Sequence, residues 1–123
     1  FFADRYFGYD DAIYAALRLL EILSQTGEKI SSLLADVPKT YATPEIRLDC
    51  PDNKKMTVVN NIKQHYRNTP GLIDIDGVRI PFDDGWALVR SSNTQPVIVL
   101  RFEASSVNRL QEIRKEVESL IHI

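Results

Sequence analysis

The sequence has 123 residues, of which 44% are hydrophobic and 26% charged, and its formal net charge is −2. This length and composition are typical of one soluble globular domain, or of a small domain with an appended piece. The slightly acidic balance disfavours nucleic acid as a partner, because nucleic-acid binding requires a basic surplus on some face. No apolar stretch approaches the roughly 20 residues that cross a bilayer, and no basic-then-apolar leader is present. We therefore expect a cytoplasmic protein that is not inserted in a membrane.

The chain begins with the aromatic segment FFADRYFGY. A terminus is normally exposed and mobile, so this apolar content leads us to expect a chain cut from something larger. We expect the segment to be partly disordered or to pack back on the first helix.

Residues 10–25 predict a helix, because apolar side chains recur at helical spacing and Asp10 and Asp11 suit its first turn. Gly27 is a plausible terminator. A second short helix is expected over 29–35, before Pro38.

The next segment, 40–50, predicts a strand in which Pro44 marks an edge or a bulge. Asp52 or Asn53 could cap a helix over 54–67, which presents an apolar face.

The period then changes to alternation. We expect strands over 72–75, 78–82 and 86–90, joined by tight turns at Asp76-Gly77 and Asp84-Gly85. The nearly continuous apolar run over 97–103 predicts a central strand. Ser105 or Ser106 then caps a last amphipathic helix.

This order predicts an α+β fold: an antiparallel sheet with two helices packed on one face. We expect two parts. Residues 1–36 are interpreted as the helical tail of a preceding domain, and residues 37–123 as a separate domain.

The segment RSSNTQP joins the predicted strands 86–90 and 97–103. Ser91, Ser92, Asn93 and Thr94 offer hydroxyl and amide donors, and successive turn N–H groups can converge on an anion. Arg90 adds a guanidinium whose fork matches two phosphate oxygens. The loop therefore predicts a phosphate site, with a merely solvated polar turn as the alternative.

Other candidate chemistries are weaker. The single cysteine, Cys50, is interpreted as a structural thiol. His65 and His122 belong to no metal-ligand spacing, and Asp83-Asp84 is typical of a turn. Arg101 is expected to form a structural ion pair with Glu103 or a helix carboxylate.

RSSNTQPVIVLRFEA resembles the C-terminal phosphate-binding loop of the α-D-phosphohexomutases, and FFADRYFGYDDAIYAALRLLEILSQ resembles the segment that follows the sugar-recognition loop in that family's third domain. The two segments occur in the family's order with a matching spacer. The resemblance implies the last helix of the third, sugar-binding domain followed by the whole fourth, phosphate-binding domain.

The resemblance also implies an activity: reversible transfer of phosphate between C1 and C6 of mannose or glucose phosphate through a bisphosphorylated sugar. Arg90, Ser92, Asn93 and Thr94, with Ser91 between them, correspond to the family's phosphate contacts, and they would hold the phosphate that is not being transferred. Gln95 stands where relatives often carry threonine. No cofactor is expected in this chain. Magnesium, its aspartate ligands, the phosphoserine and a hexose 1,6-bisphosphate activator are implied for the full-length enzyme, and the partners are a phosphosugar and the other three domains. The chain alone is expected to be inactive.

Two alternatives from other classes stay open. One is a non-catalytic interaction module whose antiparallel sheet binds a protein or a nucleic acid. The acidic balance and the absence of an aromatic and basic sheet face argue against nucleic acid. The other is a purely structural domain, in which substitutions in the loop have no effect.

Overall fold

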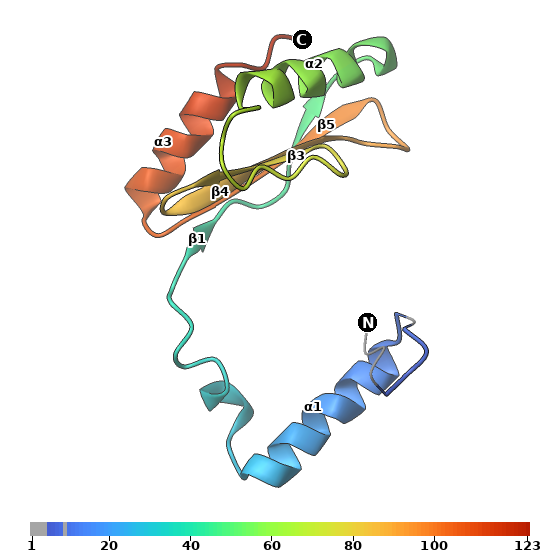
Figure 1. Cartoon of the computed structure of the whole chain (residues 1–123), viewed down its shortest axis with the longest axis vertical. Helices are drawn as coiled ribbons and strands as arrows, with labels where there is room; N and C mark the ends of the chain where they lie inside the picture. The colour runs from blue at the N-terminus through green and yellow to red at the C-terminus, as the bar shows by residue number, and fades with distance from the viewer. Residues whose placement is uncertain (1–4, 9) are drawn as a thin grey trace. The chain divides into compact units, whose positions relative to one another are not determined.

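The computed structural model describes residues 5–8 and 10–123, and the chain divides into two compact units, Phe1–Pro38 and Lys39–Ile123. Figure 1 shows the elements of each unit. No helix in the described ranges is long and apolar enough to cross a membrane.

The first unit contains helix α1 (Ala12–Thr26) and a single 3-10 turn, η1 (Ile30–Ser32). The side chain of Asp11 caps α1 by accepting a hydrogen bond from the Tyr14 N–H, and Gly27 ends it with φ of 68°, as predicted. The helix expected over 29–35 was wrong in extent, since only η1 forms.

The aromatic segment at the start is described in part. The ring of Tyr6 stacks on that of Tyr14 with 4.3 Å between centroids, and the Tyr6 hydroxyl donates to Asp11 at 2.9 Å. Packing against the first helix is thus confirmed for Tyr6. Phe7, in contrast, is 82% exposed, and its ring contacts that of Tyr6. Residues 1–4 and 9 lie outside the described residues.

The second unit is an antiparallel sheet with two helices. Its strands are β1 (Tyr41–Ala42), β2 (Ile46–Asp49), β3 (Val78–Phe82), β4 (Gly85–Ser91) and β5 (Val97–Ala104), and its helices are α2 (Asp52–His65) and α3 (Val107–Glu118). The sheet order is β1-β5-β4-β3, and β2 also pairs with β5. Both helices lie on the same side of the sheet (Figure 1), which confirms the α+β prediction.

The central position predicted for β5 is confirmed. It pairs with β4 along one side and with β1 and β2 along the other. β1 and β2 form one interrupted edge strand, because Pro44 lacks an N–H to donate to the ladder. The Thr43 hydroxyl replaces part of the ladder by accepting from the Phe102 N–H at 3.2 Å.

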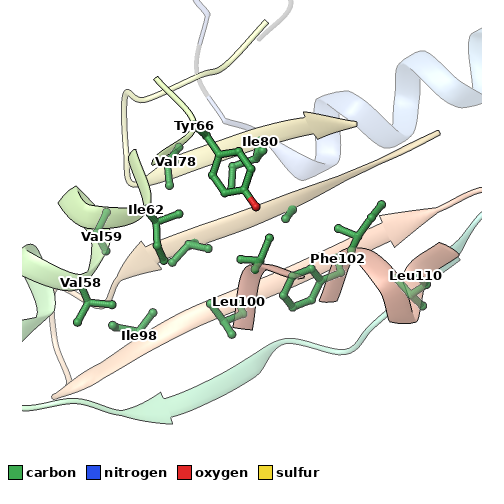
Figure 2. Packing of buried hydrophobic residues seen from close by; sticks show 14 of the residues in the cluster. Val58, Val59, Ile62, Tyr66, Val78, Ile80, Ile98, Leu100, Phe102 and Leu110 are labelled. Atoms are coloured by element: carbon green, nitrogen blue, oxygen red, sulfur yellow. The ribbon is translucent and has the colours of Figure 1, made fainter. Parts of the chain in front are cut away.

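The core lies between the sheet and the two helices. Alternate residues of β5, Ile98, Leu100 and Phe102, are 0–1% exposed and pack against the helices. Figure 2 shows Ile62 of α2 and Leu110 of α3 together with these side chains of β5. Tyr66, just after α2, joins the two helices by donating its hydroxyl to Glu116 at 2.8 Å, and burial, followed by this hydrogen bond, raises the pKa of Tyr66.

Helix caps in this unit followed the sequence in one case and not in the other. Ser106 caps α3 by accepting from the Arg109 N–H, as predicted. The cap position of α2 is taken by Pro51, so the predicted cap by Asp52 or Asn53 was wrong.

Two details of the meander were also wrong. Residues 72–75 form no strand, and only an isolated bridge joins Ile73 to Arg79. Gly77 has the positive φ expected of it, 79°, but it belongs to a wider loop in place of a two-residue turn. A Cβ on Gly77 would lie 2.4 Å from the Val89 carbonyl oxygen, so the loop backbone packs closely against β4.

The β3–β4 turn is centred on Asp83-Asp84, since Phe82 pairs with Gly85. Gly85 is therefore a strand residue, and glycine is needed there for close approach to a neighbour. A Cβ at Gly85 would meet the Glu103 carbonyl oxygen at 2.4 Å.

Candidate functional site

The candidate loop spans residues 92–96, between the last residue of β4 and the first of β5. Its base is closed by the Ser92 N–H, which donates to the Val97 carbonyl at 3.0 Å. The Cys50 N–H donates to the Pro96 carbonyl at 2.8 Å, which fixes the loop to the segment after β2. The loop is thus held at both ends by backbone bonds.

Inside the loop, the Ser92 hydroxyl oxygen accepts hydrogen bonds from the N–H groups of Thr94 and Gln95, at 3.4 and 3.2 Å. Short hydroxyl side chains commonly bend the following backbone in this way. The Ser92 hydroxyl proton is not used by these bonds. Ser92 therefore shapes the loop and keeps one donor for a ligand.

Three donors at the tip have no hydrogen-bond partner among the described residues: the backbone N–H of Asn93, the side-chain amide of Asn93 and the hydroxyl of Thr94. Both residues are exposed. The expectation that successive backbone N–H groups converge was wrong, because those of Ser92, Thr94 and Gln95 are already engaged. The unpaired donors at the tip come from one backbone amide and from side chains.

Arg90 lies on the face of the sheet turned away from α2 and α3, which we call the outer face. It alternates with the fully buried Ala87 and Val89, whose side chains point to the helices. Its Nη1 is 3.4 Å from Oδ2 of Asp76, a long contact between partly exposed groups. Such a surface pair is weak, so the guanidinium can exchange this partner for an incoming anion.

Ser91 is placed differently from its neighbour. Its hydroxyl lies 3.6 Å from the Met56 sulfur of α2, on the helix side of the sheet. The structure therefore separates the side chains of Arg90 and Ser91 onto opposite faces, and leaves Ser92, Asn93 and Thr94 together in the loop.

Sequence reasoning did not single out Arg47. In register, Arg47 of β2 and Arg90 of β4 both pair with Val99, so the two arginines flank Val99 on the outer face. The Arg47 Nη1 donates to the Gln95 side chain at 2.6 Å, and its Nε donates to Glu45 at 2.8 Å. Only the register of β2 against β5 reveals this, and no local pattern signals it.

A second residue missed from the sequence is Lys55 of α2. Its Nζ donates to two carbonyl oxygens of the loop, those of Ser92 at 2.6 Å and Gln95 at 2.9 Å. Lysines near a helix start are ordinary surface residues, so the sequence offered no signal beyond its place in the helical pattern.

The outer face as a whole is more basic and aromatic than the sequence suggested. Arg79 of β3 lies over the Trp86 ring, 4.9 Å from its centroid. Arg101 of β5 is exposed on this face and forms no ion pair with any described residue, so the predicted ion pair was wrong. The premise that the sheet has no aromatic and basic face was also wrong.

Two kinds of candidate remain: the single cysteine and the side-chain types that bind metals. Cys50 is buried and free, as expected of a structural thiol. Over residues 5–8 and 10–123, no group of three or more His, Cys, Asp or Glu side chains could hold a metal ion. A shallow cavity of about 210 Å³ lies at the other end of the sheet, next to Trp86, and does not reach the loop.

Two family models match the chain. Residues 45–120 match the phosphoglucomutase/phosphomannomutase C-terminal domain, and residues 1–41 match the alpha/beta/alpha domain III of the same family. The sequence and the fold thus define an α+β domain of phosphohexomutase type.

Relatives and a solved structure agree with the models. The chain is 45% identical over 115 residues to a phosphomannomutase/phosphoglucomutase of Pseudomonas putida, covering 93% of this chain and 25% of that protein. It is 38% identical over 124 residues to a phosphoglucomutase of Neisseria meningitidis, covering 98% and 27%. A phosphoglucomutase/phosphomannomutase family structure from Burkholderia thailandensis superposes with a TM-score of 0.79 at 37% identity, covering 98% of this chain and 25% of that one. The chain belongs to the phosphoglucomutase/phosphomannomutase family, and it spans about a quarter of the length of these relatives.

Proposed function

We propose that the loop Ser92–Thr94, together with Arg90, binds the phosphate group of a hexose phosphate. The observation that carries this proposal is the set of unpaired donors on Asn93 and Thr94, in a loop that is otherwise tied down. Arg90 at the end of β4 adds a guanidinium held only by a long contact to Asp76. Phosphate oxygens accept hydrogen bonds from such donors, and a guanidinium can bind two of them.

The loop would act within a mutase that interconverts 1-phospho and 6-phospho forms of mannose or glucose through a bisphosphorylated sugar. It would hold the phosphate that is not being transferred. Binding energy from this remote group can orient the reacting end. A site that contacts only the phosphate accepts either end of the sugar, which suits an intermediate that must turn around.

We also propose the division of roles along the chain. Residues 1–36 would be the end of a sugar-binding domain and residues 37–123 the phosphate-binding domain, with a hinge near residues 36–40. Such a hinge would let the second domain close over the ligand. The chain alone would then bind but not catalyse, with the other domains of the same chain as its partners.

Magnesium and a hexose 1,6-bisphosphate activator are implied for the full-length enzyme. No carboxylate cluster suited to the metal occurs in the described ranges, so the described residues would not hold the magnesium. The bisphosphate, in contrast, fits the loop through either of its phosphates.

The direct test is a titration of the ¹⁵N-labelled chain with glucose 1-phosphate, followed by amide chemical shifts. Shifts should concentrate at Arg90 to Gln95. Scattered shifts, or none up to the solubility limit of the ligand, would contradict the proposal.

A matched pair of variants sharpens the test in the full-length enzyme. Arg90→Lys should lower kcat/KM about tenfold or more, because a two-pronged guanidinium becomes a point charge and a charge-assisted hydrogen bond is lost. Arg101→Lys is the control, because Arg101 lies exposed on the same face without an ion pair among the described residues. Equal activities of the two variants would remove Arg90 from the site.

The outer face supports a second candidate, an interaction module that binds a protein or nucleic acid through the sheet. Arg79 over Trp86, with Arg101 nearby on the adjacent β5, gives a basic and aromatic surface of the kind that stacks on bases. Filter binding of single-stranded RNA at low salt separates the candidates. Retention that is lost in Arg79→Ala, without response to glucose 1-phosphate, would favour the module.

A further inference from the structure

Lys55 is the one buried charged residue in the part of the chain that the structure describes. Its side chain is 11% exposed, and Nζ has three oxygen partners: the carbonyls of Ser92 and Gln95, and Oδ1 of Asp52 at 2.7 Å. An ammonium has three protons to donate, so its donor capacity is fully used. A buried ammonium is costly without such partners, and here every partner is an oxygen.

The two carbonyl partners enclose the tip of the loop. Ser92 precedes Asn93 and Thr94, and Gln95 follows them, so one ammonium pins the loop on both sides of its unpaired donors. These contacts cross 37 and 40 positions in the sequence. Lys55 thereby ties the start of α2 to the loop between β4 and β5.

Because the peptide bond is planar, the hydrogen bond from Lys55 to the Ser92 carbonyl also fixes the direction of the N–H that follows it. In a trans peptide the carbonyl of one residue and the N–H of the next point in opposite directions. Because the Ser92 carbonyl points at Lys55, the Asn93 N–H points away from α2. That N–H is the backbone donor left without a partner among the described residues of the loop, and Asn93 is exposed.

We propose that Lys55 is a positioning residue for anion binding: it holds the loop in the conformation that directs the Asn93 N–H and the neighbouring side-chain donors outward to a phosphate. This inference rests on the proposed function of the loop. Lys55 does not touch the ligand in this arrangement, because its three protons are directed to Ser92, Gln95 and Asp52.

A filler role for the lysine stem is the competing explanation, and Lys55→Met separates the two. Methionine keeps the unbranched stem and loses the three hydrogen bonds. Lys54→Met is the matched control, since Lys54 is the adjacent residue of α2 and is exposed. Both variants and the unmodified 123-residue chain would be compared by ¹⁵N amide shifts, amide hydrogen exchange and titration with glucose 1-phosphate.

We expect Lys55→Met to weaken glucose 1-phosphate binding by about tenfold or more, and to shift and speed the exchange of the amides of Asn93 to Gln95 before any ligand is added. Lys54→Met should match the unmodified chain in both. Lys55→Arg, which retains donors, should recover part of the affinity. Urea unfolding of each variant separates loop effects from a loss of fold, and Lys55→Gln replaces Lys55→Met if the latter does not fold.

The outcomes distinguish this inference from the proposed function. Unchanged loop amides and unchanged affinity in Lys55→Met would overturn the positioning role and leave phosphate binding in place. No binding by the unmodified chain, with altered loop amides in Lys55→Met, would overturn the proposed function while supporting the clamp.

Discussion

The two loops that flank β4 are both short and polar, yet the structure uses them in opposite ways. The turn at Asp83-Asp84 is closed by its own surroundings. The Asp84 carbonyl accepts from the Ser105 N–H at 2.9 Å, and its carboxylate accepts from Nε of Arg109 at 2.8 Å. Hydrogen bonds to Asp84, and then to Glu112, raise the pKa of Arg109.

In the loop at residues 92–96, the hydrogen bonds to the rest of the fold lie on the side of α2, and the unpaired donors lie on the exposed side. Lys55 and the Ser92 hydroxyl satisfy its inward groups, while Asn93 and Thr94 face solvent with donors unused by the described residues. Polar composition alone therefore does not distinguish the two loops. What distinguishes the two loops is whether their polar groups are satisfied inside the fold.

The largest expected effect is on stability, at the turn between β3 and β4. Gly85→Ala should destabilise the chain by about 3 kcal/mol, because the new Cβ would meet the Glu103 carbonyl oxygen of the neighbouring strand at 2.4 Å. Urea unfolding monitored by circular dichroism measures this. A change below about 0.5 kcal/mol in the free energy of unfolding would show that the backbones at Gly85 and Glu103 can move apart easily.

A substitution in the loop at residues 92–96 should act on phosphate binding instead of stability. Ser92→Ala removes the acceptor for two loop amides and one free donor, so affinity for glucose 1-phosphate should fall about tenfold with little change in stability. Ser105→Ala, beside the closed turn, is the control. Equal affinities of the two variants would erase the functional difference between the loops.

The ion pair of the closed turn should contribute only modestly to stability. Asp84→Asn should cost about 0.5 kcal/mol, and less in high salt, because the pair with Arg109 is partly exposed. Phosphate binding should not change. Asp83→Asn, next to it and exposed, controls for the charge itself, and a salt-independent loss in Asp84→Asn would contradict an electrostatic origin.

The smallest expected effect concerns the proposed anion site. Asp76→Asn removes the carboxylate that competes for Arg90, so glucose 1-phosphate should bind about twofold more tightly at low salt. Asp74→Asn serves as control, because Asp74 belongs to the same loop but pairs with Lys63. Tighter binding in both variants would point to general charge in place of the Arg90 contact.

Much of the fold follows from local patterns. The alternation in Val78–Phe82, the apolar run of Val97–Ala104 and the helical stripe after Ser106 each predicted the observed element, because burial of one face imposes a period of two or of 3.6 residues. The candidate loop was also located, since it had to join two recognisable strands.

These local patterns gave wrong predictions where a segment distant in the sequence packs against the element. Residues 72–75 alternate like a strand. However, the loop before β3 packs against β4 at Gly77, and only the bridge from Ile73 to Arg79 forms. Gly85 was expected to serve a turn, and its lack of a side chain instead admits the backbone of β5.

The sequence by itself determined the order and type of most elements and the position of the polar loop beside Arg90, because these depend on neighbours within a few residues. Only the tertiary structure decided that Arg47 lies in register with Arg90 and that Lys55 clamps the loop. Such contacts join residues about 40 positions apart, and their geometry depends on strand register and helix docking, which leave no local trace in the chain.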